Sequence, residues 1–206
     1  MSMGAPYAML GPGLEFSPVT RPVRVLVDLD DVLADWNGHL DKLMDNHPSL
    51  HDVPRKAERV SWDWDEVTDE QYALLRAIMD EPHFYQMLLP LPGAQEGVAA
   101  LEASGAEVFL VSSPLLTNHG CPSEKYEWVR EYFGPSLAQR LILTHDKTVI
   151  HGDVLIDDKP KITGANVRPS WRRIIFDQPW NQGVAGVRLS SWDHTDVQLA
   201  ISEAFQ

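Results

Sequence analysis

The stretch VRVLVDLDDVLADW, residues Val23 to Trp36, places a run of apolar residues directly before four aspartates. The apolar run has the near-continuous hydrophobicity of a strand that is covered on both faces, which is typical of a parallel sheet. The aspartates are Asp28, Asp30, Asp31 and Asp35. Carboxylates this close repel one another unless a cation or a shared proton offsets their charge. The stretch therefore predicts a buried parallel strand with an acidic site at its carboxyl end.

Asp28 and Asp30 are two residues apart, so in an extended chain their side chains lie on the same side while Asp31 faces away. A divalent cation would offset their repulsion, and Mg²⁺ prefers oxygen ligands, usually one or two carboxylates together with a substrate phosphate. Asp157 and Asp158 follow another apolar run and could supply the remaining ligand. No Cys and His spacing in the sequence resembles a zinc site. The sequence therefore favours Mg²⁺.

The fold class follows from strand-like runs that alternate with helical patterns. Further buried strands are predicted at Glu107 to Ser112, Leu141 to Thr144, Val154 to Asp157 and Arg173 to Asp177. Helices are predicted at Ala94 to Ser104 and at Ser123 to Gly134. This alternation predicts an open α/β fold with a mostly parallel central sheet flanked by helices. Ligands bind beyond the carboxyl ends of the strands in such sheets, where Asp28, Ser112, Thr144 and Asp157 lie.

The chain divides into three predicted regions. Residues 1–20 contain no Lys or Arg, which argues against a signal or transit peptide, and their Gly and Pro residues predict a flexible tail. Residues 21–35 and 91–206 form the α/β core. Residues 36–90 interrupt the alternation with helical stretches near Gly38 to Asn46 and Asp69 to Met79, which predicts a helical cap inserted after the first strand. Asp35 would serve the start of the first of these helices.

Composition limits the possible partners. The chain has 17 basic and 30 acidic residues and a net charge of −13, so binding to a nucleic-acid polymer is disfavoured. No apolar run approaches the length needed to span a bilayer, so no membrane association is expected. The single Cys121 cannot form an intramolecular disulfide, which suits a reducing compartment, and a cytoplasmic location is expected. A small phosphorylated substrate remains compatible with this charge, because local cations can outweigh the mean field.

The residue types at the strand ends predict phosphoryl transfer. A carboxylate beside Mg²⁺ can attack phosphorus and form an aspartyl phosphate. A second carboxylate can protonate the leaving oxygen and later activate water. Ser112 and Lys147 could hold the phosphoryl oxygens.

Four short motifs resemble those of the haloacid dehalogenase superfamily of phosphatases. DLDDV is similar to its first motif, DxDxV, whose first Asp is the nucleophile and whose second Asp is the acid and base. VFLVSSP resembles the second motif, in which a strand ends in a phosphate-binding Ser or Thr. DKT and VLIDDK resemble the third and fourth, the latter an acidic pair that completes a Mg²⁺ site. The resemblance implies a Rossmann-like core with a small helical cap.

Longer stretches resemble the 5′(3′)-deoxyribonucleotidase family: DLDDVLADW, PLPGA, VFLVSSPL, SEKYEWVREYFGP, LTHDKT and LIDDKPKITGA. This resemblance covers about Arg24 to Trp180 and weakens in the cap. It implies a Mg²⁺-dependent 5′-nucleotidase that hydrolyses (deoxy)ribonucleoside monophosphates to nucleoside and phosphate through an aspartyl phosphate. It also implies a homodimer.

The resemblance implies a role for each matching position. Asp28 would be the nucleophile and Asp30 the acid and base, with the backbone carbonyl of Asp30 also on Mg²⁺. The metal site would comprise Asp28, Asp30, Asp157 and Asp158, with Asp158 expected as the direct ligand of the last pair. The phosphate would be surrounded by Ser112, Ser113, Lys125 and Lys147. The substrate pocket would include Trp36, Trp62, Tyr85 and Leu115.

Three positions depart from the family pattern. Asp31 stands where many members carry Gly, and it is expected to point away from the nucleophile. Ser112 replaces the more usual Thr and keeps the hydroxyl. His145 stands where relatives often have Arg, which predicts a weaker contact to a phosphate or to the 3′ side of the substrate.

Three other functions fit parts of the pattern. A superfamily phosphatase for another small phosphate ester would have the same core and a different cap. A phosphoacceptor signalling domain also combines paired acids, a hydroxyl and a Lys, but it places the accepting Asp on a later strand and lacks a cap of this size. A non-catalytic nucleotide-binding protein would not need the pair Asp28 and Asp30.

Overall fold

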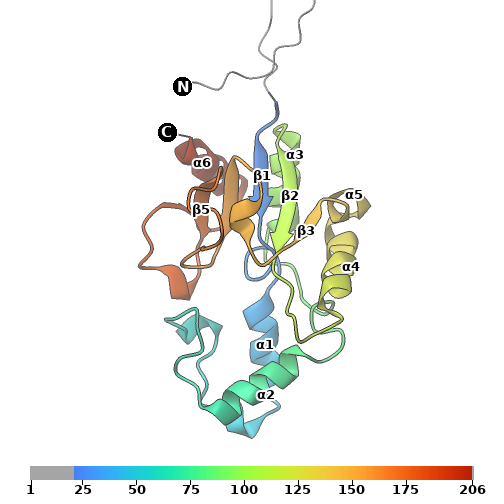
Figure 1. The fold of residues 1–206 in the computed structure, drawn as a ribbon, viewed down its shortest axis with the longest axis vertical. Helices are drawn as coiled ribbons and strands as arrows, with labels where there is room; N and C mark the ends of the chain where they lie inside the picture. The colour runs from blue at the N-terminus through green and yellow to red at the C-terminus, as the bar shows by residue number, and fades with distance from the viewer. Residues whose placement is uncertain (1–20, 206) are drawn as a thin grey trace, which may run out of the picture.

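The computed structural model describes residues 21–205. The predicted tail, residues 1–20, lies outside the described residues. In the described part, six parallel strands form one sheet in the order β3-β2-β1-β4-β5-β6 (Figure 1). The strands are β1 (Arg24–Val27), β2 (Glu107–Ser112), β3 (Leu141–Leu143), β4 (Val154–Asp157), β5 (Arg172–Phe176) and β6 (Val187–Leu189). The predicted α/β class with a parallel sheet is confirmed.

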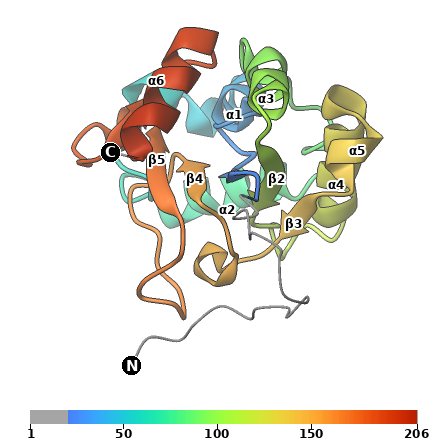
Figure 2. The same cartoon turned by 90° about the horizontal axis from the view of Figure 1, so that it is seen from above.

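The α-helices lie between β1 and β2, between β2 and β3, and after β6. They are α1 (Trp36–Met44), α2 (Asp69–Met79), α3 (Ala94–Ala103), α4 (Cys121–Phe133), α5 (Pro135–Ala138) and α6 (His194–Ala204). Seen from above, α3 and α6 lie on one side of the sheet and α4 and α5 lie beside β3 (Figure 2). Helices α1 and α2 lie beyond the carboxyl ends of the strands (Figure 1).

The two faces of β1 bury side chains in different clusters, as the alternation of a strand requires. Val25 and Val27 belong to the large core cluster that the helices complete. Leu26 points to the opposite face and packs with Val111, Leu155 and Trp171. Both faces of β1 are therefore buried, which explains why its sequence is continuously apolar.

The structure differs from the sequence expectations at two helices and one strand. Helix α4 begins at Cys121 instead of Ser123, and the Asn118 side chain accepts hydrogen bonds from the backbone N–H groups of Gly120 and Cys121 in the turn that leads into the helix. Strand β6 and helix α6 were not predicted. With 3 residues, β6 is too short to show a periodic pattern.

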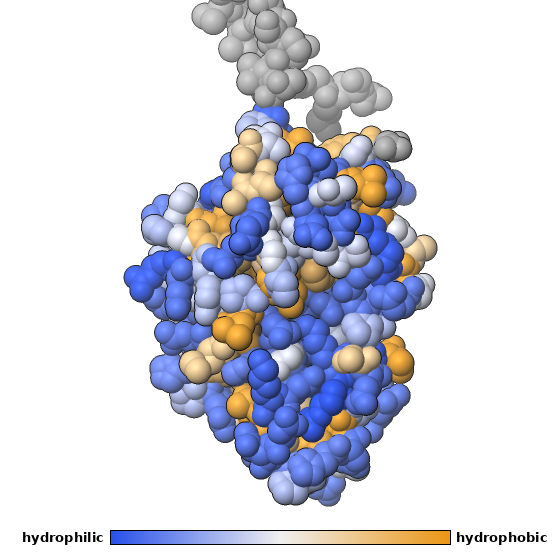
Figure 3. All heavy atoms as spheres, turned by 180° about the vertical axis from the view of Figure 1, so that it is seen from behind, coloured by the Kyte–Doolittle hydropathy of each residue, from blue (hydrophilic) through white to orange (hydrophobic). Residues whose placement is uncertain are grey.

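None of the helices in the described range is both long and apolar enough to cross a membrane. On the face turned away from the view of Figure 1, apolar residues are scattered among hydrophilic ones (Figure 3).

Candidate functional site

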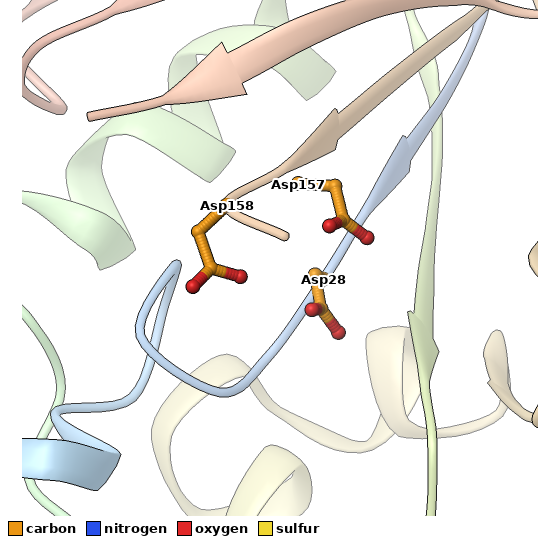
Figure 4. A group of neighbouring side chains, drawn as sticks. All are labelled: Asp28, Asp157 and Asp158. Carbon is orange, nitrogen blue, oxygen red and sulfur yellow. The ribbon is translucent and has the colours of Figure 1, made fainter. Parts of the chain in front are cut away.

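Three buried carboxylates meet at the edge of the sheet where β1 and β4 end (Figure 4). Val27 pairs with Ile156 across β1 and β4. The next residue of each strand, Asp28 and Asp157, therefore lies at the same height in the sheet. Asp158 is the next residue, and one carboxylate oxygen from each of these three residues lies within 4.8 Å of the others. Burial, which outweighs the opposing effect of Lys147, raises the pKa of Asp28 to about 6. Burial also raises the pKa of Asp158, and the neighbouring carboxylates Asp157 and Asp28 add to this effect.

Lys147 partly neutralises this group. Its Nζ lies 2.7 Å from Asp28 Oδ1 and 2.6 Å from Asp157 Oδ2. The residue begins a short 3₁₀ turn, Lys147–Val149, directly after Asp146, whose side chain accepts a hydrogen bond from Thr148 N. Burial alone would lower the pKa of Lys147, but Asp157 and Asp28 together outweigh burial and raise it. Lys147 therefore stays charged between two carboxylates.

Asp158 has an oxygen that is free to bind a cation. Its Oδ2 accepts a hydrogen bond of 2.9 Å from Trp180 Nε1. Its Oδ1 is buried and has no hydrogen-bond partner within residues 21–205. A buried, unpaired carboxylate oxygen is costly, so this arrangement fits a hard cation that takes oxygen ligands.

A second polar group forms around Lys125, which projects from α4. Its Nζ donates to the Asp30 carboxylate, to Ser112 Oγ at 2.8 Å and to the Ser113 carbonyl at 3.0 Å. The carboxylate of Asp30 therefore lies outside the three-carboxylate cluster and pairs with Lys125. Ser113 donates its hydroxyl to the Thr144 carbonyl over 2.9 Å, which links the ends of β2 and β3.

A cavity of about 630 Å³ lies beside these groups, between the core and the α1–α2 region. All four aromatic and apolar residues expected at the substrate line it: Trp36, Trp62, Tyr85 and Leu115. Trp62 also lines a smaller cavity of about 130 Å³ together with Asp28 and Lys147. The large cavity thus includes Asp30 in its wall, which combines aromatic side chains with acidic and other polar ones.

The other two aspartates of the opening stretch have separate environments. Asp31 is buried, and its carboxylate is directed to Asn37 and Lys56 instead of to the cluster. Burial raises the pKa of Asp31 to about 6. Asp35 occupies the N-cap position of α1, as expected, but its side chain makes no capping hydrogen bond. It binds Lys56 Nζ at 2.6 Å instead, because the cap brings this cation within reach.

Several residues around the site were not identified from the sequence. Arg59 donates to Asn37 Oδ1 at 2.7 Å and its guanidinium lies 4.0 Å from the centre of the Trp64 ring. Glu124 accepts hydrogen bonds from the backbone of His83 and Tyr85, at 2.8 and 3.1 Å. Arg59 belongs to none of the motifs, and although Glu124 lies within SEKYEWVREYFGP, a polar residue that contacts a distant backbone has no sequence signature. For Glu124, the one available signal was its place next to Lys125.

Comparisons with known proteins show which family the chain is similar to. The family model described as "5′ nucleotidase, deoxy (Pyrimidine), cytosolic type C protein" matches residues 21–204. The mitochondrial 5′(3′)-deoxyribonucleotidase of Homo sapiens is 39% identical over 186 residues, which cover 84% of this chain and 79% of that protein. The cytosolic-type 5′(3′)-deoxyribonucleotidase of the same species is 40% identical over 168 residues, with 77% and 81% covered.

The fold also has solved relatives. The crystal structure of a HAD family hydrolase from Deinococcus radiodurans, with bound phosphate and sodium, superposes with a TM-score of 0.56 at 16% identity and covers 90% of this chain and 98% of that one. This likeness confirms the expected haloacid dehalogenase fold. The chain belongs to the 5′-nucleotidase, deoxy (pyrimidine), cytosolic type C family, and it is a phosphoric monoester hydrolase.

Proposed function

We propose that this chain is a Mg²⁺-dependent 5′-nucleotidase that hydrolyses (deoxy)ribonucleoside monophosphates through an aspartyl phosphate. One observation carries the proposal: Asp28 and Lys147 line a cavity of about 130 Å³ that shares Asp30 and Trp62 with a larger cavity of about 630 Å³, in whose lining five aromatic residues stand. The names of the human relatives, both 5′(3′)-deoxyribonucleotidases, support the same substrate class.

The proposed Mg²⁺ ligands are Asp28 and Asp158, together with the backbone carbonyl of Asp30. Asp157 pairs with Lys147 at 2.6 Å, whereas Asp158 Oδ1 has no partner within residues 21–205, so Asp158 is the better direct ligand. Mg²⁺ bound there would offset the charge of the carboxylates and of the substrate phosphate.

In the first proposed step, an oxygen of Asp28 attacks phosphorus, and the bond between phosphorus and the nucleoside oxygen breaks. Asp30 gives its proton to the leaving oxygen, so nucleoside departs and an aspartyl phosphate remains. In the second step, Asp30 takes a proton from water, whose oxygen attacks phosphorus and releases phosphate and free Asp28. Lys125 holds Asp30 and Ser112 in place and, with Lys147, offsets charge on the phosphoryl oxygens.

Steady-state phosphate release over a panel of nucleoside monophosphates and sugar phosphates tests this proposal, with Mg²⁺ and then with EDTA. We expect deoxyribonucleoside monophosphates to be preferred and EDTA to abolish turnover. Asp28→Asn, which removes the nucleophile, is expected to lower kcat at least about a thousandfold. Its circular dichroism spectrum should match that of the wild type.

Two outcomes would contradict the proposal. Normal turnover by Asp28→Asn would exclude the aspartyl phosphate. A preference for sugar phosphates by orders of magnitude would favour the alternative, a phosphatase for another small ester.

Three further expectations stay predictions. They are the division into a cap of residues 36–90 and a core of residues 21–35 and 91–206, a cytoplasmic location, and a homodimeric state. Size-exclusion chromatography with light scattering would test the last of these.

A further inference from the structure

Asp31 occupies a backbone conformation that normally favours glycine. Its φ is 55°, in the left-handed region where a Cβ atom is disfavoured. It is also 3% exposed, and its carbonyl accepts a hydrogen bond of 2.6 Å from Gln178 Nε2. A buried acid at such a position requires compensating contacts of its side chain.

Those contacts reach the α1–α2 region. Asp31 Oδ1 lies 3.1 Å from Lys56 Nζ, and Lys56 also binds Asp35 at 2.6 Å. Asp31 further accepts hydrogen bonds from the backbone of Asn37 at 3.1 Å and from its side chain at 2.6 Å. The loop that follows the catalytic pair is therefore tied to Lys56.

Lys56 is the first residue of a segment that forms one wall of the substrate cavity. Three residues later, Arg59 donates to Asn37 Oδ1 and to the Trp62 carbonyl, at 2.7 and 2.5 Å. Trp62 lines both the large cavity and the smaller one beside Asp28. The position of Trp62 thus depends on two buried or half-buried cations, Lys56 and Arg59, that bind the Asp31–Asn37 pair.

We propose that Asp31 is a positioning residue that fastens the segment from Lys56 to Trp64 to the catalytic loop, so that the cavity wall is in place before a nucleotide binds. The identity of the substrate rests on the proposed function, whereas the attachment itself does not. If this wall of the cavity is ordered before the nucleotide binds, binding loses less conformational entropy. The reaction steps at phosphorus stay the same.

Asp31→Gly, Lys56→Met and the double variant test the proposal. Glycine suits the backbone at residue 31, so the first variant removes the contacts without adding strain. Lys42→Met is the matched control, because Lys42 is an exposed lysine of α1 with no ion pair among the described residues. Each variant is assayed with a deoxyribonucleoside monophosphate and with p-nitrophenyl phosphate, which has no nucleoside.

We expect each single variant to raise KM for the nucleotide roughly tenfold, the effect of one charge-assisted hydrogen bond, with kcat changed less than about twofold. The double variant should be no worse than the worse single variant, because both disrupt one attachment. Turnover of p-nitrophenyl phosphate and the Lys42→Met kinetics should equal those of the wild type. An unchanged nucleotide KM, equal losses on both substrates, or independent effects in the double variant would overturn the proposal.

Hydrogen exchange separates this proposal from the proposed function. In Asp31→Gly, the backbone amides from Arg59 to Trp64 should exchange at least about tenfold faster than in the wild type, and unchanged exchange would overturn the attachment. If the wild type hydrolyses p-nitrophenyl phosphate and no nucleoside monophosphate, the proposed function fails, and the exchange measurement still decides whether Asp31 holds the segment.

Discussion

The four aspartates of the opening stretch differ in chemistry because each meets a different environment. Each one contacts a lysine from a distant part of the chain: Asp28 contacts Lys147, Asp30 contacts Lys125, and Asp31 and Asp35 share Lys56. Neighbouring residues of identical type can therefore take separate roles.

Trp180 provides a test of the metal site at the residue scale. Its indole N–H donates to Asp158 Oδ2, which orients the carboxylate and leaves Oδ1 for the proposed Mg²⁺. Trp180→Phe keeps an aromatic ring and removes the donor, so we expect Mg²⁺ affinity to fall roughly 10- to 100-fold, as is usual when a group that orients a metal ligand is lost. The Mg²⁺ dependence of phosphate release measures this.

The control is Trp128→Phe. Trp128 is buried and also donates its indole N–H, to the Leu88 carbonyl at 2.8 Å, but it belongs to α4 and does not touch the carboxylate cluster. We expect this variant to lose stability and to keep its Mg²⁺ affinity. Equal Mg²⁺ affinity in Trp180→Phe and the wild type would show that Asp158 does not need the indole.

At the scale of elements, α3 and the segment before α6 pack against the loop that follows β1. Trp192 lies against α3 and donates its indole N–H to the Val32 carbonyl at 2.7 Å. The contact is close at Gly97, where an added Cβ would lie 2.5 Å from Trp192 Cε3 and 3.0 Å from its carbonyl oxygen. Gly97 is therefore needed for packing, although glycine is a poor helix former.

Gly97→Ala tests this packing. In an unhindered helix the change would stabilise the protein by about 1 kcal/mol, but here the overlap with Trp192 should instead lower the free energy of unfolding by about 1–3 kcal/mol. Urea denaturation measures the difference. Gly183→Ala is the control, because a Cβ there would meet nothing within 4 Å, and we expect a change below about 0.5 kcal/mol. A stabilised Gly97→Ala would show that Trp192 moves aside without cost.

At the scale of the whole molecule, the chain carries a net negative charge and also buries several aspartates. The net charge is −13, and the buried aspartates at the carboxyl edge add local repulsion that ion pairs with Lys147, Lys125 and Lys56 partly offset. Burial raises the pKa of both Asp28 and Asp31 from the ordinary 3.8 to about 6. Asp28 and Asp31 therefore bind more protons in the folded chain than in the unfolded chain between about pH 4 and pH 6.

The resulting prediction links stability to pH and Mg²⁺. In EDTA, Tm should rise as the pH is lowered from 7.5 through about 6, because protonation of the buried carboxylates favours the folded chain. At pH 7.5, Mg²⁺ at about 100 times its Kd should stabilise the fold by about 2.7 kcal/mol, or roughly 5–10 °C in Tm, and should remove most of this pH trend. Differential scanning calorimetry measures both effects.

Asp28→Asn is the control for this experiment. It cannot take up a proton at residue 28, so its Tm in EDTA should rise less as the pH falls. A Tm that decreases with falling pH in EDTA, or that does not respond to Mg²⁺, would contradict the prediction.

Much of the fold and part of the site could be predicted from the sequence because their signals are local. Continuous apolar runs followed by Asp28, Ser112 and Asp157 indicated parallel strands and the edge at which a ligand binds. The spacing of Asp28 and Asp30 indicated a pair of carboxylates for phosphoryl transfer. Strand β6 was missed because three residues are too few to show a periodic pattern. Helix α6 was missed as well.

Only the tertiary structure decided which charges pair. The contact between Asp30 and Lys125 joins residues 95 positions apart, and nothing local in either segment specifies it. The burial of Asp31 at a positive φ, its contact with Lys56 and the free oxygen of Asp158 likewise depend on how the α1–α2 region lies over the sheet. The sequence by itself determined five of the six strands and the acidic residues at their ends, because hydrophobic periodicity and motif spacing are properties of neighbouring residues. Folding decided the partner of each carboxylate, because pairing depends on distance and burial in three dimensions.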